Sequence, residues 1–212
     1  MTPIRPTRIV IADDHRVVLA GLVALFSDED DMEVAGTATS GAQVIRLVEQ
    51  VLPDVLVLDV DMPGEGVTGI LKTLARHAPR TRIVVFSGMP EQQYGESVAR
   101  FGAHGFVDKS ALPQVLVEAV RGAAQGRYFF GGSAATQPPE PSVGTGDVPR
   151  FTSREMQVFL RLAHGNRVTD IAGELGVSLV TVSTHRKSVL AKLGVSNNSE
   201  LTRQAVRNGF IA

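Results

Sequence analysis

The sequence contains no cysteine, and this absence excludes disulfide bonds, thiolate metal ligands and a cysteine nucleophile. It is also compatible with a reducing compartment. No apolar run approaches the ~20 residues that a membrane-spanning helix requires. The N-terminal stretch, MTPIRPTRIVIADDH, has an apolar run too short and too closely flanked by charge to resemble a signal peptide. We therefore expect a cytoplasmic protein.

The charge of the chain is small overall but unevenly distributed. The 212 residues carry a net charge of −1. Residues 150–212 contain nine Lys or Arg and four Asp or Glu, a balance of +5, which leaves −6 for residues 1–149. This asymmetry predicts an acidic domain followed by a basic one, and the basic domain is a candidate for binding a polyanion.

The domain boundaries follow from a segment rich in Pro, Gly, Ser and Thr, SAATQPPEPSVGTGDVP. Its composition predicts a linker. We therefore assign residues 1–131 to a first domain, residues 132–149 to the linker and residues 150–212 to a second domain.

Short β-branched runs alternate with helical patterns in the first domain, which predicts an α/β fold with a parallel five-stranded sheet. The expected strands are residues 8–12, 32–38, 54–59, 82–87 and 105–109. The helices between them should place these residues towards the core: Val18, Leu22, Leu25, Phe26, Val44, Leu47, Val48, Val51, Leu112, Val115, Leu116 and Val120.

The second domain lacks a convincing strand pattern and predicts four short helices. Thr152 and Glu155 have the spacing of a capping box, and Gly165 is expected to end that first helix. Ser178 is a good N-cap for a longer helix that stops at Gly194. The remaining helices are expected around the apolar stripe of Val168, Ile171, Ala172 and Leu175, and over residues 199–208.

Five polar residues of the first domain fall at the carboxyl ends of predicted strands: Asp13, Asp14, Asp59, Ser87 and Lys109. In an open parallel sheet this edge binds ligands. Clustered carboxylates repel one another unless a cation neutralises them, and oxygen ligands facing a phosphate favour Mg²⁺. Asp59 would then be both a metal ligand and a nucleophile. Ser87 would donate a hydrogen bond to a phosphoryl oxygen, and Lys109 would supply a fixed positive charge.

Each of these residues also has a simpler interpretation when taken alone. An Asp after a strand commonly forms a turn or caps a helix, a Ser commonly lies in a turn, and a Lys is commonly a solvated surface residue. The inference therefore depends on the shared position of the five residues at one edge of successive strands.

The segments IADDH, LVLDVDMPG, VVFSG and GFVDKS resemble the signature segments of the receiver domain of two-component response regulators, over residues 8–130. The resemblance implies a (βα)5 flavodoxin-like fold and phosphorylation of Asp59 by a histidine kinase or a small phosphodonor. It also implies Mg²⁺ bound by Asp14, Asp59 and the backbone carbonyl of Asp61, with Asp13 close by.

The same resemblance implies that Ser87 and the aromatic Phe106 change position together on phosphorylation. From its pattern alone, Phe106 is equally well explained as a core or edge-strand aromatic, and it lacks the hydroxyl of the Tyr found in many relatives. The segment GEGVTG after Pro63 is longer than the turn typical of the family, and we expect this difference to affect kinase docking or phosphate lifetime.

Two alternatives remain open for this domain. The pair Asp59 and Asp61 after an apolar strand is also similar to haloacid-dehalogenase phosphatases, where the first Asp is the nucleophile and the second a general acid/base. Those enzymes carry their other acidic pair after the Lys, whereas Asp13 and Asp14 come first here. The second alternative is a receiver that takes no phosphate and acts only through protein contacts.

The second domain has the pattern of a helix-turn-helix, whose second helix enters the major groove. Val182, Val189 and Leu193 should pack inward, while Ser183, Thr184 and Lys187 should reach base edges. Candidate contacts to phosphates are Thr181, Arg186, Lys192, Asn197 and Asn198. Taken alone, a basic helix is more commonly a solvated surface.

The segments TSRE, DIAGELGVSLVTVSTH and KLGV resemble the LuxR-type helix-turn-helix. Together with the receiver segments, they make the chain similar to response regulators of the NarL/FixJ class. The resemblance implies a DNA-binding transcription regulator in which Glu155, Ile171, Ala172, Val182 and Leu193 maintain the fold. Phosphorylation of Asp59 is then expected to favour a homodimer or to free the recognition helix, so that promoter DNA is bound at two half-sites.

Overall fold

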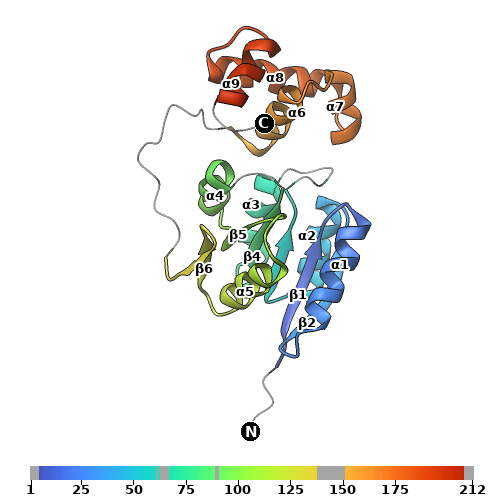
Figure 1. The fold of residues 1–212 in the computed structure, drawn as a ribbon. Helices are drawn as coiled ribbons and strands as arrows, with labels where there is room; N and C mark the ends of the chain where they lie inside the picture. Colours follow the sequence, from blue (N-terminus) through green and yellow to red (C-terminus); the bar gives the residue numbers. More distant parts are fainter. Residues whose placement is uncertain (1–4, 61, 63–66, 89–90, 138–150, 208–212) are drawn as a thin grey trace. The chain divides into compact units, whose positions relative to one another are not determined.

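The computed structural model describes residues 5–60, 62, 67–88, 91–137 and 151–207. The chain divides into two compact units, Met1–Ser142 and Val143–Ala212, and each is described by itself (Figure 1). Among the described residues, no helix combines the length and the apolarity needed to cross a membrane. The segments GEGVTG and Asp61, which the sequence singled out, lie wholly or largely outside the described residues.

The first unit is an α/β sandwich built on one sheet with the strand order β2-β1-β3-β4-β5-β6-β7. Pairing is parallel from β2 through β6, and β7 is antiparallel to β6. The strands are β1 Thr7–Ala12, β2 Met32–Ala38, β3 Val55–Leu58, β4 Arg82–Ser87, β5 Gly105–Asp108, β6 Tyr128–Phe130 and β7 Ser133–Ala135. The helices are α1 Arg16–Ser27, α2 Gly41–Val51, α3 Val67–His77, α4 Glu91–Arg100 and α5 Pro113–Ala124.

The central strands are buried on both faces, as their continuous Val, Ile and Leu runs predict. All four residues of β3 are buried, and so is β1 from Ile9 to Ala12. On one face, alternate residues of the strands pack with buried residues of α1 and α5 such as Phe26 and Leu116. Helices α2 and α3 cover the other face (Figure 1).

Leu112 is a correction to the predicted apolar stripe of α5. It was expected to face the core, but its side chain is exposed, because α5 begins at Pro113 and Leu112 occupies the extended N-cap position. Proline is favoured in the first turn of a helix, where its missing N–H has no intrahelical partner to lose.

The sheet extends beyond the five predicted strands, and part of the predicted linker belongs to it. Ser133–Ala135 form β7, although the composition placed these residues in the linker. Gly131 and Gly132 both adopt positive φ, so they form the tight turn that returns the chain against β6. Phe129 of β6 is buried beside Gly105 of β5, where an added Cβ would lie 3.1 Å from the Phe129 carbonyl oxygen. Residues 133–135 therefore belong to the sheet, and the remaining bounds of the linker stay a prediction.

The second unit consists, over its described residues, of α6 Ser153–Ala163, α7 Val168–Leu175, α8 Leu179–Leu193 and α9 Asn198–Arg207. The capping box of Thr152 and Glu155 is confirmed, and Ser178 caps α8 by accepting a hydrogen bond from the Thr181 N–H. Gly176 and Gly194 end α7 and α8 in the left-handed conformation. The predicted inward residues of α8, Val182, Val189 and Leu193, are buried.

Candidate functional site: an acidic pocket and an exposed helix

Backbone hydrogen bonds between neighbouring strands bring the predicted polar residues to one edge of the sheet. The Asp59 N–H donates to the carbonyl of Ala12 at the end of β1, at 2.8 Å. The Lys109 N–H donates in the same way to the carbonyl of Ser87, at 2.8 Å. Because parallel strands end at the same edge, residues far apart in the sequence become neighbours here.

Lys109 joins two buried carboxylates in the pocket. Its Nζ lies 2.7 Å from Asp13 Oδ2 and 3.2 Å from Asp59 Oδ2, while both Asp side chains are only 1% exposed. Burial by itself would lower the pKa of Lys109. The hydrogen bond to Asp13 and the charges of Asp59 and Asp13 outweigh burial, so the pKa of Lys109 lies above its ordinary value. Lys109 is therefore a permanent cation at this edge.

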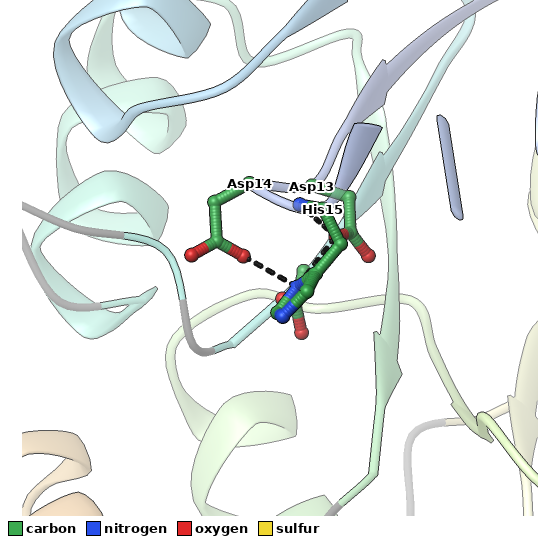
Figure 2. A group of neighbouring side chains, drawn as sticks. Asp13, Asp14 and His15 are labelled. Atoms are coloured by element: carbon green, nitrogen blue, oxygen red, sulfur yellow. Dashed lines mark hydrogen bonds and ion pairs between the residues drawn. The ribbon is translucent and has the colours of Figure 1, made fainter. Parts of the chain in front are cut away.

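Asp14 and His15 complete the cluster on the side of β1 (Figure 2). His15 Nδ1 lies 2.8 Å from Asp14 Oδ1 and 3.3 Å from Asp13 Oδ1, and the His15 N–H donates to Asp13 Oδ1. His15 was not among the site residues predicted from the sequence. Its position directly after the Asp13 and Asp14 pair at a strand end was the available signal.

The donor set of this pocket fits a divalent cation. Asp13, Asp14, His15 and Asp59 each offer one ligand atom, and these atoms lie within 4.8 Å of one another. Three neighbouring carboxylates, of which Asp13 and Asp59 contact Lys109, leave an excess of negative charge that a cation neutralises, and carboxylate oxygens suit Mg²⁺. The predicted ligand Asp61 lies outside the described residues.

The two predicted switch residues are both fully buried. Ser87 ends β4, where it pairs in register with Asp108 of β5. Phe106, two residues earlier in β5, pairs in register with Val85, and its ring is fully enclosed. Its location confirms a core position, and its predicted movement with Ser87 stays a prediction.

In the second unit, three of the predicted DNA contacts lie on the exposed face of α8. Ser183, Thr184 and Lys187 are all exposed, on the side opposite Val182 and Val189. The Thr184 hydroxyl is not directed outward, because its Oγ1 donates to the Val180 carbonyl oxygen at 2.9 Å.

The predicted phosphate contacts are held within the unit by intramolecular hydrogen bonds. Arg186 Nε donates to Asn198 Oδ1 at 2.8 Å. The Thr181 hydroxyl lies 2.8 Å from Ser178 Oγ, and Asn197 Oδ1 accepts from the Glu200 N–H. Each of these residues thus has a structural contact, and its role towards DNA stays a prediction.

Lys192, another predicted phosphate contact, pairs with the buried Glu155. Lys192 Nζ lies 2.5 Å from Glu155 Oε2, and Ser188 Oγ donates to Glu155 Oε1. Burial alone would raise the pKa of Glu155. The hydrogen bonds from Lys192, Ser188 and the Thr152 N–H outweigh burial and lower this pKa to about 2. Glu155 therefore connects the start of α6 to α8 as a permanent anion.

The α/β unit places acidic residues and one Lys at the carboxyl edge of a parallel sheet, an arrangement suited to accepting a phosphoryl group. The helical unit contains a capped helix-turn-helix, an arrangement suited to binding nucleic acid. Comparison with known proteins agrees. Residues 9–121 match the response regulator receiver domain, and residues 149–205 match the bacterial regulatory proteins of the luxR family.

Proteins similar to this chain over nearly their whole length are response regulators. The transcriptional regulatory protein YxjL of Bacillus subtilis is 32% identical, with 96% of this chain and 97% of YxjL covered. Response regulator GacA of Pseudomonas aeruginosa is 28% identical with the same coverage. RcsB of Salmonella enterica serovar Typhimurium, bound to promoter P1flhDC in the presence of the phosphomimetic BeF3−, is 26% identical with a TM-score of 0.65, and 94% of this chain and 98% of RcsB are covered.

The chain belongs to the response regulator family, with an N-terminal receiver domain and a C-terminal LuxR-type helix-turn-helix domain. It is a phosphorylation-regulated, DNA-binding transcription regulator. The receiver match, which covers Asp13, Asp14, Asp59 and Lys109 together, decides against the phosphatase alternative.

Proposed function

We propose that Asp59 is the phosphoacceptor and that a sensor histidine kinase is its phosphodonor. The observation that carries this proposal is the position of the Asp59 carboxylate, buried at the end of β3 and 3.2 Å from Lys109 Nζ. In the transfer, a carboxylate oxygen of Asp59 attacks the phosphorus of a phosphohistidine. The new P–O bond forms as the P–N bond breaks, and the histidine leaves with the electron pair of that bond.

The other residues of the pocket neutralise the charge that this transfer brings. Lys109 supplies a fixed cation, and Ser87 supplies a hydroxyl that donates to a phosphoryl oxygen. Mg²⁺, when bound by Asp13, Asp14, Asp59 and the backbone carbonyl of Asp61, would neutralise the carboxylates and the phosphoryl oxygens. The mutual proximity of the Asp13, Asp14 and Asp59 carboxylates supports this ligand set.

Phosphorylation changes the partners that compete for Lys109. Without phosphate, Lys109 is bonded to Asp13 and Asp59. A phosphoryl group adds about two negative charges to Asp59, so it attracts Lys109 and the Ser87 hydroxyl more strongly than the carboxylate does. We infer that Ser87 and Phe106 shift together in response, and that this shift favours a homodimer or frees the recognition helix α8.

The exposed face of α8 and the +5 net charge of residues 150–212 support the binding of DNA by the helical unit. Ser183, Thr184 and Lys187 would contact base edges in the major groove. Thr181, Arg186, Lys192 and Asn197 would contact phosphates from around the helix. A dimer would bind two half-sites about one helical turn apart.

The coupling is tested by measuring DNA affinity with and without acetyl phosphate and Mg²⁺, for wild type and for Asp59→Asn. We expect phosphorylated wild type to bind promoter DNA more tightly and to dimerise, and we expect Asp59→Asn to respond to neither. If Asp59→Asn bound and dimerised as phosphorylated wild type does, the proposed switch would be wrong.

The lifetime of the phosphate is a separate part of the proposal. We propose that the chain is not otherwise an enzyme, that it catalyses its own dephosphorylation, and that the side chain of Asp61, two residues after Asp59 in the sequence, tunes the rate. Replacing Asp61 with Asn should change the rate at which phosphate is lost, as measured by intact mass over time. An unchanged rate would leave the Asp61 side chain without this role.

A further inference from the structure

The exposed face of α8 begins with apolar side chains rather than with hydrogen-bonding ones. Val180 is 74% exposed and Leu179 is 50% exposed, and both lie in the first turn of α8. Exposed large apolar residues are otherwise rare in the described part of this unit, where only Val206 of α9 shares the property. The first turn of α8 therefore presents apolar surface to solvent.

Thr184 extends this apolar surface by one helical turn. Positions 180 and 184 are four residues apart and lie on the same face of α8. Because the Thr184 hydroxyl donates to the Val180 carbonyl, it is already used within the helix. The hydroxyl and the methyl group occupy different directions around Cβ, so the exposed remainder of Thr184 is its methyl group. Val180 and the Thr184 methyl group form one patch, here called the methyl patch.

Polar groups surround the methyl patch on the same face. Ser183 lies between its two members in sequence, and Lys187 follows at i+3 from Thr184. Both residues are exposed. The face thus combines apolar contact area with a cation one turn further along the helix, within residues 150–212, whose net charge is +5.

In the DNA major groove, the apolar group on a base edge is the C5 methyl group of thymine. We propose that Val180 and the Thr184 methyl group contact thymine methyl groups and make thymine a specificity-determining base of each half-site. This inference rests on the DNA-binding function proposed above and names the feature of DNA that the helix recognises. The positive charge of the unit supports DNA as the partner of this face, because an apolar patch among cations matches a methyl group in a polyanionic groove.

Uracil-substituted DNA isolates the proposed contact, because uracil keeps the hydrogen-bonding edge of thymine and lacks only its C5 methyl group. Preferred sites are first selected from a random duplex library with the full-length chain, acetyl phosphate and Mg²⁺. Each thymine of the selected site is then replaced singly by uracil, and affinities are measured at one salt concentration. We expect at least one position per half-site where the replacement weakens binding about three- to tenfold, the effect of one buried methyl group.

Two variants locate the contact on the helix. Val180→Ala shortens an exposed side chain, and Thr184→Ser removes the methyl group while keeping the hydroxyl bonded to the Val180 carbonyl. Each should weaken binding to thymine sites and lose sensitivity to uracil at its own position. Val206→Ala is the matched control, since Val206 is an exposed apolar residue of α9. It should bind as wild type does and keep its sensitivity to uracil.

The outcomes separate this inference from the proposed function. If the chain selects specific sites but no thymine-to-uracil replacement changes its affinity, the methyl patch does not recognise thymine, while the DNA-binding function stands. If uracil weakens binding equally in wild type, Val180→Ala and Thr184→Ser, the contact lies elsewhere on the protein and the inference is overturned. If the phosphorylated chain selects no sites at all, the proposed function itself is contradicted.

Discussion

Each of the two units buries carboxylate groups beside a Lys, but the balance between carboxylates and hydrogen-bond donors differs between them. In the helical unit, the Glu155 carboxylate receives hydrogen bonds from Lys192, from the Ser188 hydroxyl and from the Thr152 N–H. In the α/β unit, the buried Asp13 and Asp59 share the single Nζ of Lys109. The first carboxylate is saturated with donors, whereas the second group carries more negative charge than the described donors neutralise.

This difference separates a structural ion pair from a binding site. A saturated carboxylate stabilises the fold and gains nothing from a ligand. Carboxylates that outnumber the neighbouring cations repel one another and lower the stability of the free protein. A bound cation, or positive charge in a transition state, removes this repulsion.

The largest expected effect is the loss of the Glu155 carboxylate. Glu155→Ala leaves Lys192, Ser188 and the Thr152 N–H without their shared acceptor, so we expect the helical unit to lose about 2–4 kcal/mol of stability. Hydrogen exchange of the α6 and α8 amides measures this loss. Glu174→Ala is the control, because Glu174 pairs with Arg161 near the surface and should cost less than about 1 kcal/mol. Equal effects would contradict the structural role of Glu155.

The stability of the helical unit should also depend on pH through the Glu155 carboxylate. The pKa of folded Glu155 is about 2, below its ordinary value of 4.5, so the unfolded state binds more protons between these values. The stabilisation is therefore complete above about pH 4.5 and is lost as the pH falls towards 2. We expect this residue to account for on the order of 2–3 kcal/mol. Denaturant unfolding of wild type and Glu155→Gln over this range gives the difference, which should shrink as the pH falls.

In the α/β unit, removing the positive charge of Lys109 should lower the stability, and a bound metal ion should restore part of it. Lys109→Met leaves Asp13 and Asp59 buried without their shared cation, and we expect a loss of about 2–3 kcal/mol. Millimolar Mg²⁺ should recover part of this loss, as followed by denaturant unfolding. The double variant Lys109→Met with Asp59→Asn should be more stable than Lys109→Met alone. If the second substitution destabilised further, the excess of negative charge would not be the cause.

The smallest expected effect concerns the cap that orients Glu155. Thr152→Ala removes the side-chain acceptor of the Glu155 N–H and keeps the Thr152 N–H that donates to the Glu155 carboxylate. We expect a loss of about 1 kcal/mol, the usual cost of an N-cap. A loss as large as that of Glu155→Ala would mean that the cap, and not the carboxylate, holds α6 to α8.

Much of the fold was predictable because its signals are local. Continuous runs of Val, Ile and Leu marked β1, β3 and β4, and the capping box at Thr152 and Glu155 marked the start of α6. The β6 and β7 hairpin was not predicted, because its strands have three residues each and all three residues of β7 are exposed. Such short segments gain their order from pairing, β6 with β5 and β7 with β6, which composition alone does not reveal.

The acidic pocket was predictable because parallel strands end at one edge, so their order alone brought Asp13, Asp59 and Lys109 together. The contacts of the basic residues were not predictable. Lys192 and Arg186 stay predicted phosphate contacts, but the partner that each has within the unit, Glu155 for Lys192 and Asn198 for Arg186, could not be foreseen. A helical wheel gives a direction but not the partner that a neighbouring helix places there.

The identity of the phosphoacceptor is tested most directly by intact and peptide mass spectrometry of the full-length chain after incubation with acetyl phosphate and Mg²⁺. We expect wild type to gain one phosphoryl group, located on Asp59, and Asp59→Asn to gain none. A phosphoryl group on another residue, or equal labelling of Asp59→Asn, would contradict the central role of Asp59. No phosphoryl gain in wild type would instead favour a receiver that acts only through protein contacts.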